Sequence, residues 1–210
     1  MRDILAGCRV VDLSVRLVPG QEERRLEIRR GVIPSDDTFM HEIDTMSHIG
    51  THVEAPSHFF EDGADVTELP ISSFMGPARL ARLASLPANA PITSEVLDDV
   101  PGDAVSEGDI LIFTSGRPHD EAPHLTPDAA HWMAAKGIKM LGIDDSVLLG
   151  SNTADVRELH DILMSRDVPF LEVIANLEEL RKDEFFLLAL PLRIAELDSS
   201  LVRCIAIEEE

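Results

Sequence analysis

The sequence predicts an α/β fold in which a β-rich sheet is flanked by helices. Three observations lead to this prediction. Apolar runs of strand length alternate with helical patterns in the second half of the chain, whereas the first half is rich in strand patterns joined by long connections. The length of 210 residues and the hydrophobic content of 44% suit one globular domain, spanning residues 1–210, with a substantial core.

The expected strands are apolar or partly alternating runs, bounded by glycine, proline or charged residues. In chain order they span residues 9–15, 38–49, 78–85 after Gly76-Pro77, 109–115 after Gly108, 138–144, 168–174, 185–192 and 201–207. Two long stretches, 19–35 and 86–109, are expected to be loops that form a lid or a subunit contact.

Two helices are expected between the later strands. The first lies in residues 124–137, with Thr126 as the N-cap, Pro127 at the first helical position and Gly137 as the stop. The second, residues 155–167, is amphipathic. Its apolar side chains fall on one side of the helix and are Val156, Leu159, Ile162 and Leu163. The order strand, helix, strand predicts α/β architecture in this half of the chain.

Charge and cysteine content restrict the possible partners and compartments. With 18 basic and 39 acidic residues the net charge is −21, which disfavours nucleic acid as a partner. No apolar run reaches the length of about 18 residues that a membrane-spanning helix requires. Asp3, with no long apolar run before Arg9, argues against a signal peptide. Cys8 and Cys204 are expected to be buried free thiols. These features together predict a cytoplasmic protein.

The segment "SHIGTHVEAPSHF", residues 47–59, concentrates four side chains that can bind metal: His48, His52, Glu54 and His58. On a helix they would spread over two faces. Their offsets are all even, so in an extended chain they point to one face. The spacing therefore favours a strand-like segment with its polar side chains on one side.

A straight strand would nevertheless keep His48 and His52 apart by about 13 Å, too far to share an ion whose bonds are about 2 Å long. Gly50 permits a bend between them, and a second turn at Pro56 would carry His58 over the same point. A bent segment of this kind can direct imidazole and carboxylate groups at one Zn²⁺, Mn²⁺ or Fe²⁺ ion in an open, catalytic site.

The remaining histidines are poorer candidates, because no paired acid stands at a suitable spacing; they are His41, His119, His124 and His131. Other classes of enzyme have less support. The sequence holds no G-x-S-x-G elbow of a serine hydrolase, since "FTSGRP" lacks the first glycine. It also holds neither of the glycine-rich motifs that bind phosphate groups, G-x-x-x-x-G-K-[ST] and G-x-G-x-x-G.

The segment "HIGTHVEAPSHF" resembles the signature H-x-G-T-H-x-D-x-P-x-H-F of the metal-dependent cyclase family, which includes bacterial kynurenine formamidases and isatin hydrolases. Further segments resemble the family in the same order along most of the chain. They are "VVDLSVRLVPG", "DILIFTSG", "HLTPDAAHWMAAKGIKMLGID", "LHDILMSRDVPFLEVIANLEEL", "FFLLALPLRI" and "SSLVRCIAI".

This resemblance implies a metal site, a fold and an assembly. The implied ligands of one or two Zn or Mn ions are His48, His52, Glu54, His160 and Glu172, and His58 is the implied catalytic proton carrier. The implied fold is a swivelling β/β/α domain with a mixed or barrel-like sheet, and the implied assembly is a homo-oligomer, dimer or tetramer. An acid such as Glu172 in the otherwise apolar run "VPFLEV" is unusual unless it meets a cation.

The resemblance implies a metal-dependent hydrolase that cleaves an amide, ester, lactone or cyclic amide of a small molecule. Two departures from the family pattern matter. Glu54 stands where the family has aspartate, which keeps open the alternative of a catalytically silent member that binds metal or a small ligand. Arg117 stands where many relatives have tryptophan, which indicates a more polar or anionic substrate.

Overall fold

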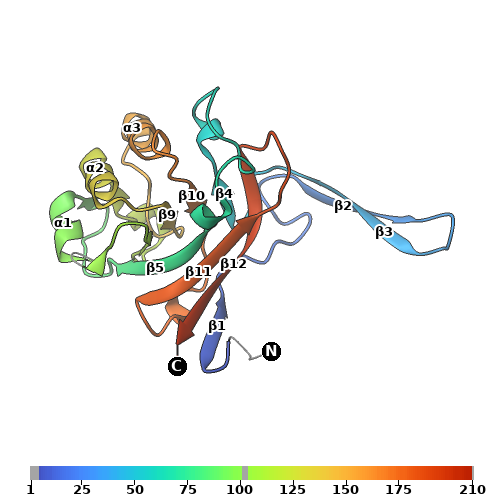
Figure 1. The fold of residues 1–210 in the computed structure, drawn as a ribbon, viewed down its shortest axis with the longest axis horizontal. Helices are drawn as coiled ribbons and strands as arrows, with labels where there is room; N and C mark the ends of the chain where they lie inside the picture. Colours follow the sequence, from blue (N-terminus) through green and yellow to red (C-terminus); the bar gives the residue numbers. More distant parts are fainter. Residues whose placement is uncertain (1–4, 101–103, 210) are drawn as a thin grey trace.

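The computed structural model describes residues 5–100 and 104–209, and its main sheet closes into a barrel (Figure 1). Within the described residues the strands follow the order β12-β11-β5-β7-β9-β10-β4 around the barrel, and β4 closes it by pairing with β12. β1 lies beside β12 outside this ring. The strands are β1 Cys8–Asp12, β4 His52–Glu54, β5 Met75–Arg82, β7 Ile110–Thr114, β9 Met140–Ile143, β10 Phe170–Glu172, β11 Glu184–Pro191 and β12 Ser199–Glu209. The predicted α/β class with a mixed, barrel-like sheet is confirmed.

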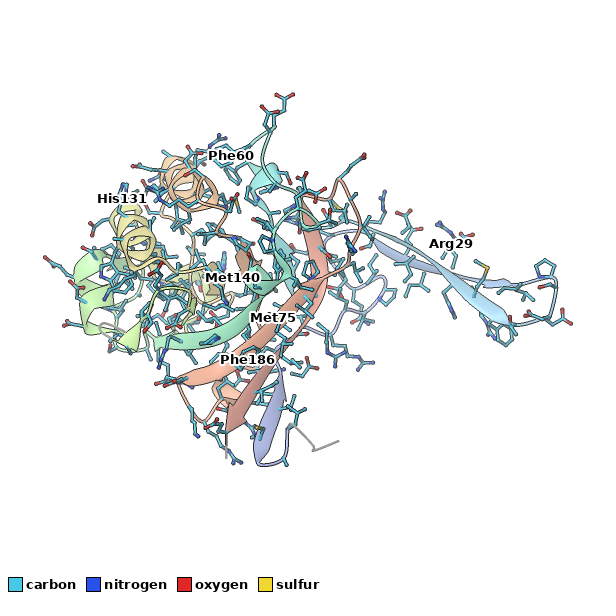
Figure 2. All side chains as sticks on the ribbon, viewed as in Figure 1. Arg29, Phe60, Met75, His131, Met140 and Phe186 are labelled. Carbon is cyan, nitrogen blue, oxygen red and sulfur yellow. The ribbon has the colours of Figure 1, made fainter. Side chains whose placement is uncertain are left out.

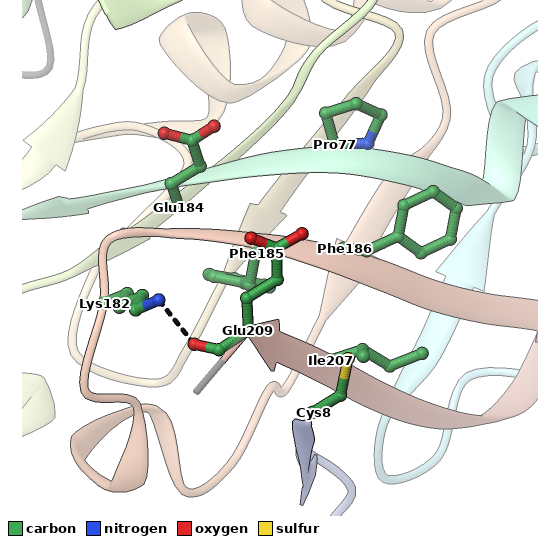
Figure 3. A pocket seen from close by; sticks show the side chains of 8 residues that line it. All are labelled: Cys8, Pro77, Lys182, Glu184, Phe185, Phe186, Ile207 and Glu209. Atoms are coloured by element: carbon green, nitrogen blue, oxygen red, sulfur yellow. Dashed lines mark hydrogen bonds between the residues drawn. The ribbon is translucent and has the colours of Figure 1, made fainter. Parts of the chain in front are cut away.

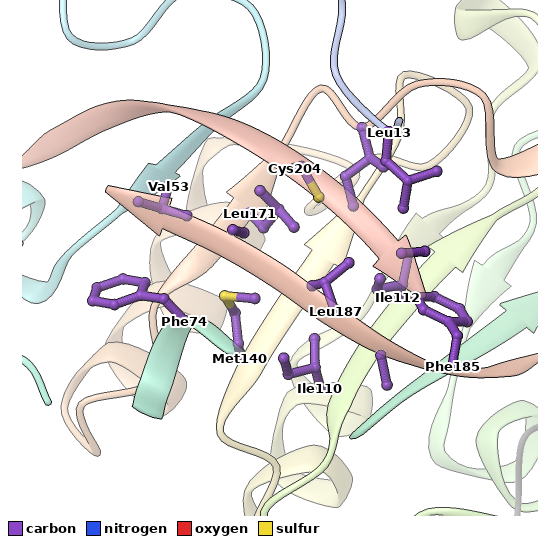
Figure 4. Packing of buried hydrophobic residues seen from close by; sticks show 14 of the residues in the cluster. Leu13, Val53, Phe74, Ile110, Ile112, Met140, Leu171, Phe185, Leu187 and Cys204 are labelled. Atoms are coloured by element: carbon purple, nitrogen blue, oxygen red, sulfur yellow. The ribbon is translucent and has the colours of Figure 1, made fainter. Parts of the chain in front are cut away.

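The helices lie together on one side of the barrel (Figure 1). Strands β5, β7, β9 and β10 are parallel neighbours, and the connections between them contain α1 (Ser94–Asp99), α2 (Pro127–Lys136) and α3 (Thr153–Met164). Apolar residues buried between the helices and the strands include Leu97, Phe113, Met133, Leu159 and Phe170. A second core fills the barrel interior (Figure 4) and includes Leu13, Val53, Phe74, Ile112, Leu171, Leu187 and Cys204.

The local signals of α2 are confirmed in the structure. The Thr126 side chain accepts a hydrogen bond from the backbone N–H of Ala129, and Gly137 ends the helix in the left-handed region at φ 70°. The second helix, expected over 155–167, instead spans 153–164, because Asn152 caps it two residues earlier than the pattern indicated. His160 lies on this helix, α3, as expected.

The strand predictions are confirmed in kind, with shifted bounds. The strand expected over 78–85 begins at Met75, so Gly76 and Pro77 lie inside β5 and do not precede it. The strand expected over 38–49 ends at Thr45 and is β3, Phe39–Thr45. Residues 47–51 form bends, which leaves the chain free to turn before β4.

The prediction that 19–35 and 86–109 are loops is wrong. The first contains β2, Leu26–Val32, which pairs with β3 in a two-stranded sheet that is separate from the barrel. We call these two strands the ribbon; it projects from the body of the molecule (Figure 1), and Arg29 lies on it (Figure 2). The second stretch contains α1 and β6, Pro91–Ile92, which pairs with β8, His124–Leu125.

The structure describes some of the features on which the prediction of a cytoplasmic protein depends. Both cysteines are free thiols, and Cys204 is buried, but Cys8 is only half-buried because it begins the outer strand β1. Among the described residues no helix is long and apolar enough to cross a membrane. Asp3, on which the signal-peptide prediction depends, lies outside the described residues.

One buried acid stabilises the junction between the end of β12 and the turn before β11. Glu208 accepts a hydrogen bond from Arg9 Nη1 at 2.8 Å and others from the backbone N–H groups of Arg181 and Lys182 at 2.8 and 2.9 Å. Burial opposes ionisation of this carboxyl, but the three donor groups around it outweigh burial and hold the pKa of Glu208 below its usual range. A lowered pKa in the folded state means that this stabilisation is complete above the unfolded pKa of about 4.3, and it is lost as the pH falls through the folded pKa.

We expect Glu208→Gln to lower the free energy of unfolding by about 1–3 kcal/mol at pH 7, because the amide loses charge-assisted hydrogen bonds. The difference from the wild type should shrink below pH 4. Urea unfolding at pH 7 and pH 3.5 measures it, with the exposed neighbour Glu209→Gln as the control. A difference that did not change with pH would contradict the assignment.

Candidate metal centre

The histidine-rich segment is bent where the sequence places its glycine and proline. Gly50 has φ +57°, and a Cβ atom there would lie 2.7 Å from the Leu17 side chain, so the bend depends on glycine. A second turn, the 3₁₀ helix Pro56–His58, follows β4 directly. Both predicted bends are confirmed.

β4 and β10 bring the early and late parts of the chain together. The two strands are antiparallel, with His52 opposite Glu172. His160 reaches the same place from α3, and its ring is held between Phe59, with ring centroids 3.9 Å apart and stacked, and Phe170, with centroids 4.7 Å apart. Side chains separated by more than a hundred residues therefore meet at one end of β4.

Two imidazoles are held with the same nitrogen facing inward. His52 Nδ1 lies 2.7 Å from the Gly50 carbonyl oxygen and His160 Nδ1 lies 2.6 Å from that of Val156. Because a carbonyl only accepts, each Nδ1 carries the proton and each Nε2 presents a lone pair. The Nε2 atoms of His52 and His160 lie 3.5 and 3.9 Å from the Glu54 carboxylate. His52 Nε2 is also 3.9 Å from Glu172 Oε2.

This arrangement fits a cation. His52 Nε2 is buried and has no hydrogen-bond partner among the described residues. A lone pair surrounded by carboxylate oxygens and shielded from water is unfavourable unless a positive charge lies between them. Backbone acceptors that fix the outer nitrogen of a histidine are typical of metal-binding imidazoles. The potential ligand atoms of His52, Glu54 and Glu172 all lie within 4.8 Å of one another.

The two carboxylates of this group have opposite tendencies to hold a proton. Burial opposes ionisation of Glu54, but the imidazoles of His160, His48 and His52 outweigh burial and lower its pKa when the nitrogen that faces the carboxylate carries a proton. Burial raises the pKa of Glu172 to about 7, and the negative charge of Glu54 contributes to this rise. A divalent ion would favour the ionised form of both carboxyls.

His48 and His58 lie on the open side of the centre and share an acid that we did not predict. His48 Nδ1 is 2.6 Å from Glu54 Oε1, and its Nε2 is 2.8 Å from Asp198 Oδ2. The same oxygen of Asp198 lies 2.9 Å from Nδ1 of the exposed His58. Burial opposes the charge on His48, but Glu54 and Asp198 outweigh burial and raise its pKa. His48, Glu54 and His58 also present potential ligand atoms within 4.8 Å of one another.

Asp198 is missed by sequence reasoning because it is one of two acids, with Glu196, in the connection between β11 and β12, and no motif surrounds it. Its backbone carbonyl accepts from the Ala55 N–H at 2.8 Å, and Ser47 Oγ donates to its Oδ1 at 3.2 Å. These contacts fix the loop against the bent segment. The only available sequence signal is its place immediately before the closing strand.

A cavity of about 370 Å³ opens beside the centre and is large enough for a small molecule. Its lining includes His48, His52, Glu172, Val15, Leu17, Val173, Asp145 and Arg24. Arg24 donates a hydrogen bond to the His48 carbonyl at this opening.

Arg117 is not among the residues that line this cavity, so the expectation that it indicates an anionic substrate gains no support from the site geometry and stays a prediction. Its guanidinium donates to the Leu86 carbonyl at 3.0 Å and lies 3.5 Å from the Glu121 carboxylate. Both contacts use donors that an anionic substrate would need.

His131, on α2, is exposed and lies apart from the centre (Figure 2). His41, His119 and His124 belong to neither group of potential metal ligands in the described chain.

A family model described as "Putative cyclase" matches residues 11–147. The kynurenine formamidase of Bacillus mycoides is 33% identical to this chain over 169 residues, which cover 77% of each protein. The kynurenine formamidase of Bacillus cereus is 32% identical over the same length and coverage.

Solved structures share the fold over nearly the whole chain. Isatin hydrolase A from Labrenzia aggregata, bound to benzyl benzoate, has a TM-score of 0.79 at 22% identity and covers 98% of this chain and 95% of its own. A potential metal-dependent hydrolase with cyclase activity has a TM-score of 0.76 at 26% identity, covering 97% of this chain and 99% of its own.

Proposed function

The chain belongs to the cyclase family, and on that premise we propose that it is a metal-dependent hydrolase that cleaves an amide, ester, lactone or cyclic amide bond of a small molecule. The single observation that carries the proposal is the buried Nε2 of His52, which has no partner among the described residues and faces two carboxylates. A cation at that place would bind the Nε2 lone pair and neutralise both carboxylates. A water molecule there would leave the two negative charges without a counter-charge.

The residues that would hold one or two ions, zinc or manganese, are His48, His52, Glu54, His160 and Glu172. When bound, such an ion would lower the pKa of its bound water towards about 7 and would polarise the carbonyl under attack. The chain contributes the rest. The imidazoles of His52 and His160 are locked by backbone acceptors, so little rotamer entropy is lost on binding. Phe59 and Phe170 exclude water from one side of the centre by covering His160.

We assign proton transfer to His58. Its Nδ1 is engaged by Asp198, so its Nε2 is the nitrogen that can take a proton from the attacking water and deliver it to the leaving nitrogen or oxygen. The side chain is exposed, as a group that meets a substrate must be. Asp198 acts as a positioning residue, because it contacts both His58 and His48 and orients the two rings.

We expect Asp198→Asn to reduce kcat by about 10–100-fold, while metal binding falls less than with a ligand substitution. The amide keeps the size of the side chain but can no longer accept with equal strength from both imidazoles. The rate-against-pH profile should shift as well, which loss of a purely structural contact would not cause. Asp120→Asn, an exposed acid outside the centre, is the control. Unchanged kcat and an unchanged profile would remove Asp198 from the mechanism.

Turnover of a panel of formamides, lactones and cyclic imides tests the proposed function. The purified protein is treated with a chelator, dialysed, and assayed with and without added Zn²⁺ or Mn²⁺, and elemental analysis gives the bound metal. We expect turnover that the chelator abolishes and metal restores. Silence across the panel despite stoichiometric metal would favour the alternative, a silent family member that uses the centre to bind a ligand. Glu54, in place of the usual aspartate, is the feature that motivates that alternative.

The proposal also covers setting and assembly. We assign a small-molecule substrate, a cytoplasmic location and a homo-oligomeric state, dimer or tetramer. The net charge of −21 supports a protein that binds neither nucleic acid nor an anionic membrane surface.

A further inference from the structure

The cavity of about 370 Å³ beside the metal centre has both apolar and acidic lining. Leu17 and Val173 are among its apolar side chains. Three of its acids, Glu22, Glu23 and Asp145, belong to neither group of potential metal ligands in the described chain. We call these three residues the cavity acids. Because the proposed ion has other ligands, they are not needed to hold it.

The two glutamates are held at the cavity by the segment 15–24, which is fixed to the histidine segment at both of its ends. The Val15 N–H donates to Thr51 Oγ1 at 2.8 Å, and Arg24 donates to the His48 carbonyl. These contacts join the wall that carries the glutamates to the same stretch of chain that carries the metal ligands. The glutamates therefore do not lie on a loop that is free to leave the site.

Hydrogen bonds fix the surroundings of the individual cavity acids as well. Glu22 Oε1 accepts from the Val18 N–H at 2.6 Å. Asp145 follows β9, where the neighbouring Asp144 accepts from Ser146 Oγ at 2.6 Å. Two separate parts of the chain thus present carboxylates to one cavity, and both parts are ordered by their own contacts.

The cavity acids differ from the acids of the larger groove over β11 (Figure 3). In that groove Glu184 is paired with Arg79 at 2.6 Å, and Lys182 is a further lining residue. In the part of the chain that the structure describes, none of the cavity acids forms an ion pair. Among the described residues that line their cavity the one basic side chain is Arg24, so the carboxylates are in excess.

An unpartnered polar atom lines the same cavity and indicates that it receives a ligand. His52 is 3% exposed, and its Nε2 has no hydrogen-bond partner among the described residues. A divalent ion at that nitrogen would be balanced by the carboxylates of Glu54 and Glu172. The negative charge of the cavity acids would then remain for whatever enters the cavity next to the ion.

We infer that the substrate is a small molecule with an apolar body and a cationic group such as an ammonium, and that the cavity acids select it by charge. The inference rests on the proposed hydrolase function, because it concerns the substrate of that reaction. The apolar lining would bury the body, while the carboxylates would attract a cation and repel an anion. Arg24 weakens this attraction without reversing it, since three carboxylates face one guanidinium.

Three para-substituted formanilides test the inference on the zinc-loaded protein. Their substituents are aminomethyl, hydroxymethyl and carboxymethyl, so the charge changes while the reacting amide stays the same. We expect kcat/KM to be at least about 5-fold higher for the cation than for the anion, mostly through KM, with the neutral compound between them. Raising the salt concentration from about 0.02 M to about 0.5 M should reduce this ratio. A smaller ratio, or a preference for the anion that Arg117 suggests, would overturn the inference.

The double variant Glu23→Gln/Asp145→Asn removes two cavity acids and keeps the size of both side chains. It should lower the ratio of cation to anion by about 3–10-fold. The matched control Asp99→Asn/Glu178→Gln removes the same charge from exposed positions outside the cavity and should keep the wild-type ratio. Circular dichroism melts establish folding, and the two single variants replace the double variant if it does not fold. An unchanged ratio in the cavity variant, or an equal fall in the control, would overturn the inference.

Calorimetric titration of the same three compounds into the zinc-loaded protein distinguishes failure of the inference from failure of the proposed function. Binding is measured whether or not a compound is hydrolysed. Tighter binding of the cation without turnover of any compound would support selection by charge and count against hydrolysis. Turnover without a charge preference would overturn the inference and leave the hydrolase proposal standing. Absence of binding of the cationic compound would also overturn the inference.

Discussion

Replacing His58 with alanine is expected to lower kcat/KM by about 10²–10⁴ while the protein keeps its metal. His58 is placed by Asp198, which holds its Nδ1 at 2.9 Å, and its ring centroid lies 4.4 Å from that of His48. It is therefore beside the centre but on its exposed side. In the proposed mechanism, loss of this imidazole removes the group that would move protons between the attacking water and the leaving atom, while the proposed nitrogen and carboxylate ligands remain.

The measurement pairs steady-state kinetics with elemental analysis of the same samples. Alanine in place of His131, which is exposed on α2, is the matched control and should leave both quantities unchanged. Two results would count against the assignment. Full activity in His58→Ala would exclude a proton-transfer role, and loss of metal together with activity would show that His58 belongs to the ligands.

The sequence predicts well what is encoded locally. Thr126, Pro127 and Gly137 specify both ends of α2, and each acts only on its near neighbours in the chain. Gly50 and Pro56 likewise specify bends in the histidine segment. Such features require no knowledge of the rest of the chain, and the structure has them as expected.

Features that depend on distant contacts are less predictable. The resemblance to a family supplied His160 and Glu172. The pairing of β4 with β10 shows physically why Glu172 meets His52, whereas His160 reaches Glu54 from α3. Asp198 was missed because its function depends on the closure of the barrel by β12 and β4, which no local pattern encodes. The residues of the site can therefore be brought together from the sequence only if the strand pairing of the sheet is predicted as well.

The ribbon was missed for a different reason. Its strands alternate apolar and charged residues, but "EIRRG" reads as polar loop when no apolar core is available to receive its apolar face. In the described residues the ribbon pairs with no other strand, so no neighbouring strand of the chain reveals it.

Replacing His52 with alanine is expected to have the largest effect, with loss of metal and a fall in turnover to the level of the metal-free protein. Substitutions that only disturb the support of a ligand cost about 10–100-fold in metal affinity, and removal of the ligand itself should cost more. The wild type, with metal at about 100 times its Kd, should gain about 2.7 kcal/mol of stability, which corresponds to roughly 5–10 °C in Tm. His52→Ala should show little of that gain.

The stability of the metal-free proteins gives a readout that does not depend on any substrate. A buried nitrogen without a hydrogen-bond partner destabilises the empty protein, so its removal offsets part of the packing that alanine loses. His52→Ala should therefore melt close to the wild type in chelator, and the two should separate when Zn²⁺ or Mn²⁺ is added. His124→Ala, in β8 outside the centre, should follow the wild type in both conditions. If His52→Ala instead gained as much from metal as the wild type, the ion would be held elsewhere, and the buried nitrogen of His52 would need a different explanation.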